Sequence, residues 1–524
     1  MSGEVQAAEP ESLRELLELR AEAAPEKAFL FSESDGRRYT YAEFDAAVNR
    51  TVRLLAAHGL GKGDVVSLLM PNSAEYIIAY FACFKLGALA GPINSLLKPP
   101  EMAYIMTNSE AKALLVNSEF MPHIESIADE LPSLDAVIEF DDESRAAQNF
   151  SGEREHLPVT SLGKDDEAII IYTSGTTGKP KGCLLTHGNL IANARQIKEW
   201  LGFTESDRLL TMMPLFHMNA VSVTTMTPLY AGASTVVSPK FSATRFWQII
   251  SDYEITSFGS VATMLTMLLE KYPEGVPAGL KTEQLRFAMC GSAPVPAEVM
   301  KRFEETFHCL VIEGYGLSES TCRSTFNPPD ERRRPGSCGM PIGNEMRVVD
   351  EEEREVADGE LGEIVLRGEN ILKGYYRNPV ANERAFRGGW FHTGDVGYRD
   401  ADGFYYIVDR KTDMIIRGGE NIYPREIDET LYEHPAVASA ATIGIPDELY
   451  GEEVTAFVVL KEGAVATEEE LLAHCRARLA DFKCPKTIHL VKEIPKGPTG
   501  KLLKRELAKR FSHPINSENS ADSR

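Results

Sequence analysis

Short apolar runs alternate with helical patterns over much of this chain. Residues Val65–Met70 form a nearly continuous apolar run that stops at Pro71-Asn72, which is typical of a strand buried on both faces of a parallel sheet. A helical pattern follows over Ala74–Leu86, and strand and helix patterns keep alternating to about Ile312. A chain of this kind buries its strands between layers of helices, so we expect a large domain of layered α/β subdomains.

The pattern changes twice in the second half of the chain. Between Val348 and Arg367 the strands are short and are broken at Asp358-Gly359, which indicates a small β-rich, antiparallel section. Beyond Asp409, short strands and two helices predict a small α+β domain. Because 524 residues exceed one ordinary core, we predict a domain over 1–411, a mobile lid domain over 412–511, and a disordered tail over 512–524.

The charge distribution argues against a polyanionic partner. Lysine and arginine number 55 and aspartate and glutamate 78, so the formal charge is 55 − 78 = −23. The acidic excess is spread along the chain, and no basic stripe that could bind nucleic acid is visible.

Targeting signals are also missing from the sequence. The first ten residues are polar and acidic, unlike a secretory signal, and no apolar run reaches the length of a membrane span. The eight cysteines are scattered without metal-ligand spacing, which is typical of reduced thiols. We therefore expect a cytoplasmic protein that is not integral to a membrane, with a homodimer left open.

The strongest local signal follows the apolar strand Ala168–Ile171. From Thr173 to Gly182 the chain packs four aliphatic hydroxyls, three glycines and two lysines, and such a loop can surround a phosphate with N–H, hydroxyl and ammonium groups. It is not a Walker A loop, because Pro180 replaces the hydroxyl that would hold magnesium. The alternative is a flexible surface loop. The candidate phosphate-binding residues are Thr173, Ser174, Gly175, Thr176, Thr177, Gly178, Lys179 and Lys181.

This segment resembles the phosphate loop of the adenylate-forming superfamily, which includes acyl-CoA synthetases, peptide-synthetase adenylation domains and luciferases. Further segments that resemble family motifs follow in the family's order as far as Lys501. The resemblance implies ATP and CoA as co-substrates and Mg²⁺ as a cofactor, with Glu319 and Thr173 holding the ion. The sequence as a whole most resembles bacterial-type fatty-acid and carnitine-type CoA ligases.

Two segments resemble the family's adenine site. Gly291–Pro294 resembles the loop along the adenine, and Glu313–Ser320 resembles the segment whose tyrosine stacks on the base. We expect the two glycines of the second segment to let a flat base lie close to the backbone. The residues implied in nucleotide binding are Ser292, Ala293, Pro294, Glu313, Gly314, Tyr315, Gly316 and Ser318.

Two further segments resemble the ribose site and the hinge. Asp395, in Trp390–Asp395, is implied to accept hydrogen bonds from both ribose hydroxyls, as a carboxylate suits a vicinal diol. Arg410 is implied to lie near the ribose and the α-phosphate. Thr412 takes the hinge position, where the family usually has aspartate or lysine.

The remaining motifs concern catalysis and the thiol. Lys501, in a Gly/Pro loop, is implied to bridge the attacking carboxylate and the α-phosphate, and His217 to lie beside that carboxylate; a solvated lysine and a core histidine are the alternatives. Gly418 and Gly419 resemble the segment for pantetheine passage. Arg476 is a candidate for the CoA phosphates, together with Lys483 and Lys486, although an ordinary solvated face explains all three equally.

The resemblance implies an acid–thiol ligase that forms an acyl-adenylate and then an acyl-CoA, with Lys501, Glu319, His217 and Thr173 as catalytic residues. Two alternatives stay open: an adenylating enzyme that loads a carrier protein, and a non-catalytic nucleotide-binding protein. The expected loss of Glu319, Asp395 or Lys501 in the latter is not seen.

The acyl substrate is the least determined feature. Residues 220–226, 258–265 and 339–342 are uncharged and predict a fatty or other apolar acid. Arg323 occupies a position that is usually apolar in fatty-acid ligases. It either faces solvent or favours a substrate with a polar or anionic far end.

Overall fold

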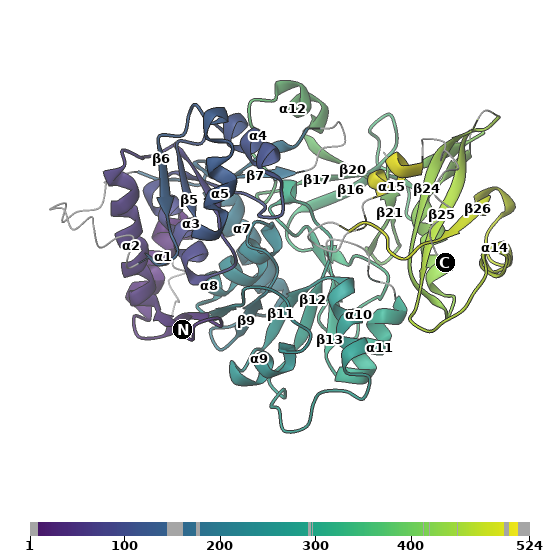
Figure 1. Cartoon of the computed structure of the whole chain (residues 1–524), viewed down its shortest axis with the longest axis horizontal. Helices are drawn as coiled ribbons and strands as arrows, with labels where there is room; N and C mark the ends of the chain where they lie inside the picture. Colours follow the sequence, from purple (N-terminus) through teal and green to yellow (C-terminus); the bar gives the residue numbers. More distant parts are fainter. Residues whose placement is uncertain are drawn as a thin grey trace, which may run out of the picture. The chain divides into compact units, whose positions relative to one another are not determined.

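The computed structural model describes residues 9–143, 161–173, 179–291, 295, 297–411, 413–418, 420–447, 449–496, 502 and 504–511 (Figure 1). The chain divides into two compact units. The first comprises residues 1–292, 301–346 and 365–392. The second comprises residues 293–300, 347–364 and 393–524. The boundary at 411/412 stays a prediction.

One sheet of the first unit leads into several of the candidate-site segments. Its order is β13-β12-β11-β9-β10-β1-β2, and every described pair is parallel except β1 with β2. Its strands are β1 (Ala28–Ser32), β2 (Arg38–Thr40), β9 (Arg208–Thr211), β10 (Ser234–Val237), β11 (Ser257–Ser260), β12 (Phe287–Cys290) and β13 (Leu310–Glu313). The carboxyl ends of β9, β11, β12 and β13 therefore share one edge, where ligands bind in open parallel sheets.

A second sheet of the same unit contains the phosphate-loop segment. Its order is β18-β8-β7-β4-β3-β5-β6, with β8 antiparallel to both of its neighbours. Its strands are β3 (Val65–Leu69), β4 (Leu89–Pro92), β5 (Ala113–Val116), β6 (Ala136–Glu139), β7 (Glu167–Thr173), β8 (Lys181–Thr186) and β18 (Gly374–Tyr375).

Helix α3 (Ala74–Leu86) lies between these two sheets. Every residue of the helix is buried, and it contacts β1 of one sheet and β3 and β4 of the other. A helix that is apolar all round requires burial of this kind. Its one buried ammonium, at Lys85, is neutralised by Asp45 at 2.6 Å and Glu18 at 3.0 Å. The helix accordingly joins the two sheets into one core.

Other helices complete the layers of the chain (Figure 1). They include α1 (Leu13–Ala23), α2 (Tyr41–Ala57), α4 (Pro99–Ser109), α5 (Met121–Glu125), α7 (His187–Leu201), α8 (Thr227–Ala231), α9 (Phe246–Asp252), α10 (Ala262–Lys271), α11 (Ala297–Phe307) and α12 (Pro379–Ala385). Within the first unit, α2 packs on α3, and α7 packs on α8.

The section predicted as β-rich forms a sheet in the order β16-β17-β20-β19, with β21 also paired to β20. The described register shows that β20 is antiparallel to β19 and β21. The strands are β16 (Glu345–Val349), β17 (Gly362–Arg367), β19 (Phe386–Arg387), β20 (Trp390–Arg399) and β21 (Tyr405–Arg410). Two short strands of two residues each, β14 (Thr325–Phe326) and β15 (Met340–Pro341), pair with each other and precede this sheet in the sequence.

The carboxy-terminal part of the second unit is a small α+β fold. Its sheet follows the order β23-β22-β25-β24, with β26 parallel to β25. It contains β22 (Ile415–Arg417), β23 (Glu420–Ile422), β24 (Val437–Asp447), β25 (Gly451–Leu460), β26 (Thr487–Leu490), α13 (Pro424–Tyr432), α14 (Glu468–Arg476) and α15 (Lys504–Phe511). A separate apolar cluster, including Ile427, Leu431, Val454 and Leu471, forms its core. The predicted large α/β part and small α+β part are confirmed.

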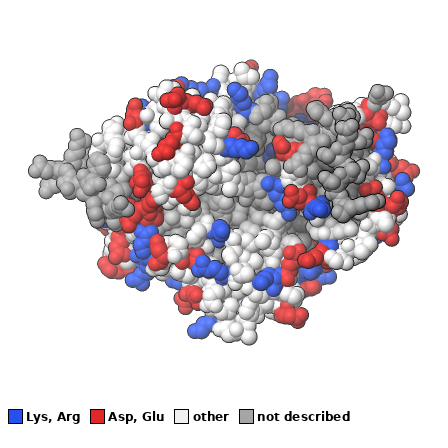
Figure 2. Space-filling model, in the orientation of Figure 1, with Lys and Arg blue, Asp and Glu red and all other residues white. Residues whose placement is uncertain are grey.

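Several global predictions can be compared with the described residues. All eight cysteines are free, as expected for reduced thiols. No helix in the described ranges is long and apolar enough to span a bilayer. On the face shown in Figure 2, acidic and basic side chains are interspersed. The predicted tail, 512–524, lies outside the described residues.

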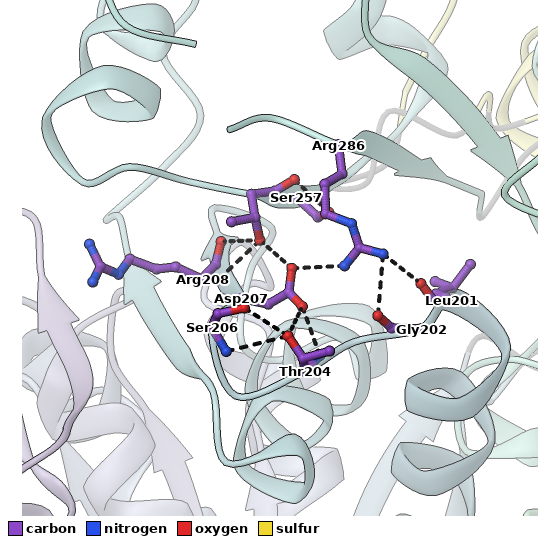
Figure 3. Close-up of polar contacts among 9 residues, drawn as sticks. Leu201, Gly202, Thr204, Ser206, Asp207, Arg208, Ser257 and Arg286 are labelled. Atoms are coloured by element: carbon purple, nitrogen blue, oxygen red, sulfur yellow. Dashed lines mark hydrogen bonds and ion pairs between the residues drawn. The ribbon is translucent and has the colours of Figure 1, made fainter. Parts of the chain in front are cut away.

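A buried carboxylate links the segments that lead into three strands of the first sheet, β9, β11 and β12 (Figure 3). Asp207 accepts hydrogen bonds from Arg286 Nη1 at 2.8 Å, Thr256 Oγ1 at 2.9 Å and the Thr204 backbone N–H at 2.7 Å. Arg286 also donates to the Leu201 carbonyl, which ends α7, at 2.9 Å. Since Asp207 directly precedes β9, this network fixes the start of a strand whose far end leads into the candidate site.

We predict that Asp207→Asn lowers the free energy of unfolding by about 2 kcal/mol, because an amide has one oxygen with which to accept these hydrogen bonds. Urea denaturation followed by circular dichroism measures the change. The matched control is Asp330→Asn, whose carboxylate pairs with the exposed Arg332; the control should leave the urea midpoint unchanged. Equal midpoints for both variants would contradict the role of the network.

Candidate active site

The predicted phosphate loop lies at the turn of a β-hairpin. Strands β7 and β8 pair antiparallel, and the last pair before the turn is Thr173 with Lys181. Residues 174–178 lie outside the described residues. The predicted strand that leads into the loop is therefore confirmed, and both described ends of the loop carry groups able to contact phosphate.

A chain of contacts links this hairpin to Glu319. The Lys181 ammonium lies over the Tyr375 ring, 4.7 Å from its centroid. The Tyr375 hydroxyl donates to Glu319 Oε1 at 3.1 Å, and the Glu319 carbonyl accepts from the Leu372 backbone N–H at 2.8 Å. The structure thus brings together two residues that are 138 positions apart in sequence, one a predicted phosphate ligand and the other a predicted magnesium ligand.

The oxygens of Thr173 and Glu319 both adjoin Cys183. Thr173 Oγ1 lies 3.8 Å from Cys183 Sγ. Burial raises the pKa of the Cys183 thiol well above its usual range, and the charge of Glu319 raises it further. Hydroxyl and carboxylate oxygens are hard donors that suit Mg²⁺, which commonly takes one or two protein oxygens and completes its shell with phosphate and water. This donor set fits the predicted ion, although the described residues contain no cluster of three acidic, histidine or cysteine side chains.

The turn that carries Tyr315 requires two positions without a side chain. A Cβ on Gly314 would collide with Thr325 and Phe326, and one on Gly316 would overlap the Cys322 carbonyl. The room beside these glycines is therefore occupied by the protein's own returning strand. Close packing of the turn therefore accounts for both glycines, and the approach of a flat base to this backbone stays a prediction.

The same turn continues through the short helix η4 (Ser318–Ser320). Thr321 follows it with φ = 65°, a conformation that L residues rarely adopt. The Thr321 hydroxyl donates to the Asn370 carbonyl at 2.7 Å, which holds the strained residue in place. Strain of about 1–3 kcal/mol per residue persists where surrounding contacts determine the backbone, often at functional sites. Arg323, two residues on, is 1% exposed, so the solvent-facing alternative is wrong.

His217 lies between β9 and an unusual helix. Burial lowers the pKa of its imidazole to about 4, so the ring is neutral near pH 7, and its Nε2 has no hydrogen-bond partner among the described residues. The following residues, Asn219–Met226, form a fully buried π-helix, η3. Such helices frequently mark functional sites. The segment 220–226 is thus buried, and its predicted lining of the acyl pocket stays a prediction.

Asp395 and Arg410 form an ion pair in the second unit. They face each other across β20 and β21, and Arg410 Nε lies 3.1 Å from Asp395 Oδ1. Asp395 is 3% exposed, and Gly394 before it adopts φ = 73° and donates to Glu363. The predicted ribose residue and the predicted ribose and α-phosphate residue are therefore neighbours.

The predicted hinge falls at the edge of the described residues. Lys411 donates to Glu363 Oε2 at 2.8 Å and its N–H to the Gly394 carbonyl at 2.9 Å. Thr412 itself lies outside the described residues, as do Ser174 to Gly178, Ser292 to Pro294, Gly419 and Lys501.

The segment around Lys501 has well-defined ends. Lys496 and Leu502 form an antiparallel bridge that brackets residues 497–501. Lys504, at the start of α15, is half-buried, and its ammonium lies 2.9 Å from the carboxylate of Asp428. Burial lowers the pKa of Lys504, but Asp428 and Asp409 outweigh this effect, so the pKa is raised overall and the side chain stays charged.

The candidate thiol-site residues are less closely defined. Gly418 adopts φ = 60° and donates to the Tyr450 carbonyl at 2.8 Å. Arg476 is exposed at the end of α14. Lys483 pairs with Glu426 at 2.8 Å, which favours the structural explanation for that lysine.

Sequence reasoning missed Tyr375 and Asn219. Tyr375 lies in a two-residue strand 56 positions from its partner Glu319, and no local pattern distinguishes it. Asn219 is the last residue of the segment Met213–Asn219 that carries His217, but sequence reasoning gave it no role. Its amide is buried without a hydrogen-bond partner among the described residues. The sequence signal that could have identified Asn219 is a polar residue in an otherwise apolar segment.

Comparison with known proteins identifies the family. The AMP-binding enzyme family matches residues 17–376, and the AMP-binding enzyme C-terminal domain matches residues 426–501. The chain belongs to the AMP-binding enzyme family. This AMP-binding enzyme is 37% identical to a sulfoacetate–CoA ligase of Cupriavidus necator, over 95% of this chain and 98% of that protein.

Other relatives share the same overall length. The AMP-binding enzyme is 34% identical to the long-chain-fatty-acid–CoA ligase FadD13 of Mycobacterium tuberculosis, over 95% of this chain and 98% of that protein. Its fold is similar to ATP-bound MatB from Rhodopseudomonas palustris, with a TM-score of 0.88, 31% identity, and coverage of 95% and 99%. The predicted family membership is confirmed.

We predict that Gly316→Ala lowers acid-dependent ATP–pyrophosphate exchange by about 100-fold or more, because the new Cβ must displace the Cys322 carbonyl and with it the turn that carries Glu319. The control is Gly61→Ala, where an added Cβ meets no atom within 4 Å. Exchange and thermal denaturation are measured on both variants. Wild-type exchange in Gly316→Ala would contradict the packing argument.

Proposed function

We propose that this AMP-binding enzyme is a carboxylate–CoA ligase that converts a carboxylic acid, ATP and CoA into acyl-CoA, AMP and diphosphate through an acyl-adenylate. The observation that carries the proposal is the contact chain from Lys181 through Tyr375 to Glu319. It sets a cation and a carboxylate beside the hairpin turn that resembles the family's phosphate loop. The relatives named CoA ligases over their full length support CoA as the acceptor.

In the first half-reaction a carboxylate oxygen bonds to the α-phosphorus while the bond to diphosphate breaks. The hairpin residues and Lys181 bind the phosphates, and Lys501 neutralises the charge on the attacking oxygen and the α-phosphate. Glu319 and Thr173 hold Mg²⁺, which when bound neutralises phosphate charge. His217 is neutral at pH 7 and supplies a dipole, not a charge, beside the acid.

Three side chains and one loop recognise the nucleoside. Tyr315 stacks on the base, with the adenine loop Ser292–Pro294 along its edge. Asp395 accepts the ribose hydroxyls, and Arg410, its partner at 3.1 Å, orients that carboxylate and reaches the α-phosphate. An ion pair between two rigid strands holds its geometry without reorganisation when the nucleotide binds.

In the second half-reaction the thiolate sulfur bonds to the acyl carbon and AMP leaves. The small domain rotates about Thr412, so Lys501 withdraws and the segment at Gly418 and Gly419 replaces it. The bridge between Lys496 and Leu502 and the ion pair of Lys504 with Asp428 keep both ends of the lysine segment fixed to the small domain during this motion.

The class of carboxylic acid that the enzyme activates is a separate point. The uncharged segments predict an apolar acid, and one relative is named for long-chain fatty acids. Others are named for sulfoacetate and oxalate, which are small and anionic at both ends. The family therefore supports a carboxylate without choosing among these classes.

The test is CoA-dependent release of AMP and diphosphate by the purified protein with ATP, Mg²⁺ and a panel of carboxylic acids. Release that requires both the acid and CoA supports the ligase. Pyrophosphate exchange without CoA-dependent turnover would instead indicate a carrier-protein acceptor.

We predict that Lys501→Ala abolishes adenylate formation and leaves thiolysis of a supplied acyl-adenylate within a few-fold of wild type, because the lysine charge acts only on the α-phosphate step. Stopped assays of each half-reaction separate the two. The control is Lys492→Ala, an exposed lysine nearby, which should preserve both half-reactions. Equal loss of both half-reactions in Lys501→Ala would exclude the assigned role.

A further inference from the structure

Arg323 is held in the interior by its backbone. Asn193 Nδ2 donates to the Arg323 carbonyl at 2.7 Å, and Asn370 Nδ2 donates to the same oxygen at 3.2 Å. Asn193 belongs to α7 and is itself buried. The residue is thus fixed from two segments far away in sequence.

The contacts of the Arg323 side chain fix the direction in which its guanidinium points. Nη1 donates to the Gly314 carbonyl at 3.1 Å, and the guanidinium lies over the Phe326 ring, 5.1 Å from its centroid. Any Cβ at position 291 would overlap the guanidinium, so the glycine that follows β12 makes room for it. These contacts place the charge at the carboxyl end of β12, at the sheet edge that carries the other motifs.

One edge of this guanidinium is not satisfied. Nε and Nη2 are both buried and have no hydrogen-bond partner among the described residues. Arginine cannot lose its proton in a protein, so it cannot escape this cost by becoming neutral. Leaving a buried charge without an opposing one costs several kcal/mol. Nε and Nη2 together form the fork that binds a carboxylate or sulfonate in a bidentate manner.

A second unsatisfied group lies on the same face of the sheet. The Asn219 amide, with both polar atoms unpartnered among the described residues, lies against Gly259 of β11. Gly259 pairs with Met289, and Gly291 follows Met289 by two residues, so the two glycines face the same side. From strand geometry they are roughly 8 Å apart. Asn219 is also two residues from His217.

We propose that Arg323 binds a second anionic group, carboxylate or sulfonate, at the far end of a short acyl substrate, with the Asn219 amide as a neighbouring donor. This inference rests on the proposed ligase function and names its substrate class. In this proposal the carboxylate that is activated lies near His217, and Arg323 receives the other end of the acid. A plain alkyl chain would leave the same charge desolvated and unpaired, so the site selects against it.

The experiment measures kcat/KM of the wild-type enzyme for acids matched in chain length. The pairs are malonate with propionate, succinate with butyrate, and glutarate with valerate, and 3-sulfopropionate tests the sulfonate. We expect at least one dianion to exceed its matched monocarboxylate by about 100-fold or more. The dicarboxylate and sulfonate arms identify which anion is bound.

Variants test the residue itself. Arg323→Met should lower kcat/KM for the preferred dianion by about 100-fold or more and leave the KM for ATP unchanged. Arg323→Lys should recover part of the loss. The ligand-free Arg323→Met protein should melt at or above the wild-type temperature, because the variant removes a buried charge that has no ion-pair partner among the described residues. Arg208→Met, a half-buried arginine that stacks on Phe31, is the control and should not alter the preference between paired acids.

The outcomes separate the two proposals. CoA-dependent AMP release with monocarboxylates preferred would overturn this inference and leave the ligase intact. AMP release from no acid, together with no shift of the melting temperature by any dianion, would overturn the ligase and this inference with it. An equal loss for all acids in Arg323→Met with a lowered melting temperature would assign Arg323 a structural role only.

Discussion

The close approach of the turn at Gly314 and Gly316 to the returning chain at Cys322–Phe326 determines much of the candidate site. Because the two segments touch, Tyr315 is fixed on one side and Glu319 on the other. The backbone N–H groups of Ser324 and Thr325 both bond to the Tyr315 carbonyl, which locks the contact. Arg323 leaves the returning chain at this point and reaches back to the Gly314 carbonyl. A single packing contact therefore sets the positions of the ring predicted to stack on the base, the predicted metal ligand and the proposed anion receptor.

The sequence predicts the features that depend on local patterns. The buried strand at Val65 and the helix Ala74–Leu86 appear as expected, since a continuous apolar run followed by a largely apolar helix has few other solutions. Motif order also predicts that Asp395 and Arg410 contact the nucleotide, and the structure shows the two residues paired with each other. Patterns among neighbouring residues, and a family's order of motifs, are therefore enough to predict these elements and candidate residues.

Other features depend on partners that are distant in sequence. The burial of Arg323 follows from Asn193, Asn370 and Gly291, none of which is adjacent to it. Tyr375 meets Glu319 only because β18 pairs with β8. The π-helix at Asn219–Met226 has no sequence signature that distinguishes it from an α-helix. The packing of the two glycines also depends on a segment that lies six to twelve residues further on, Cys322–Phe326, which fills the space beside them.

The order of strands in the first sheet has a consequence for how the chain is made. Strand β1 pairs with β10, more than 200 residues later, while β3, β4, β5, β6 and β7 are all complete by residue 173. As the chain leaves the ribosome, the second sheet can assemble these strands while β1 and β2 still wait for their neighbour. Helix α3 must meanwhile keep one face uncovered, since it is buried against strands of both sheets. The apolar Ala28–Phe31 segment is thus the part of the nascent protein most dependent on protection from premature association.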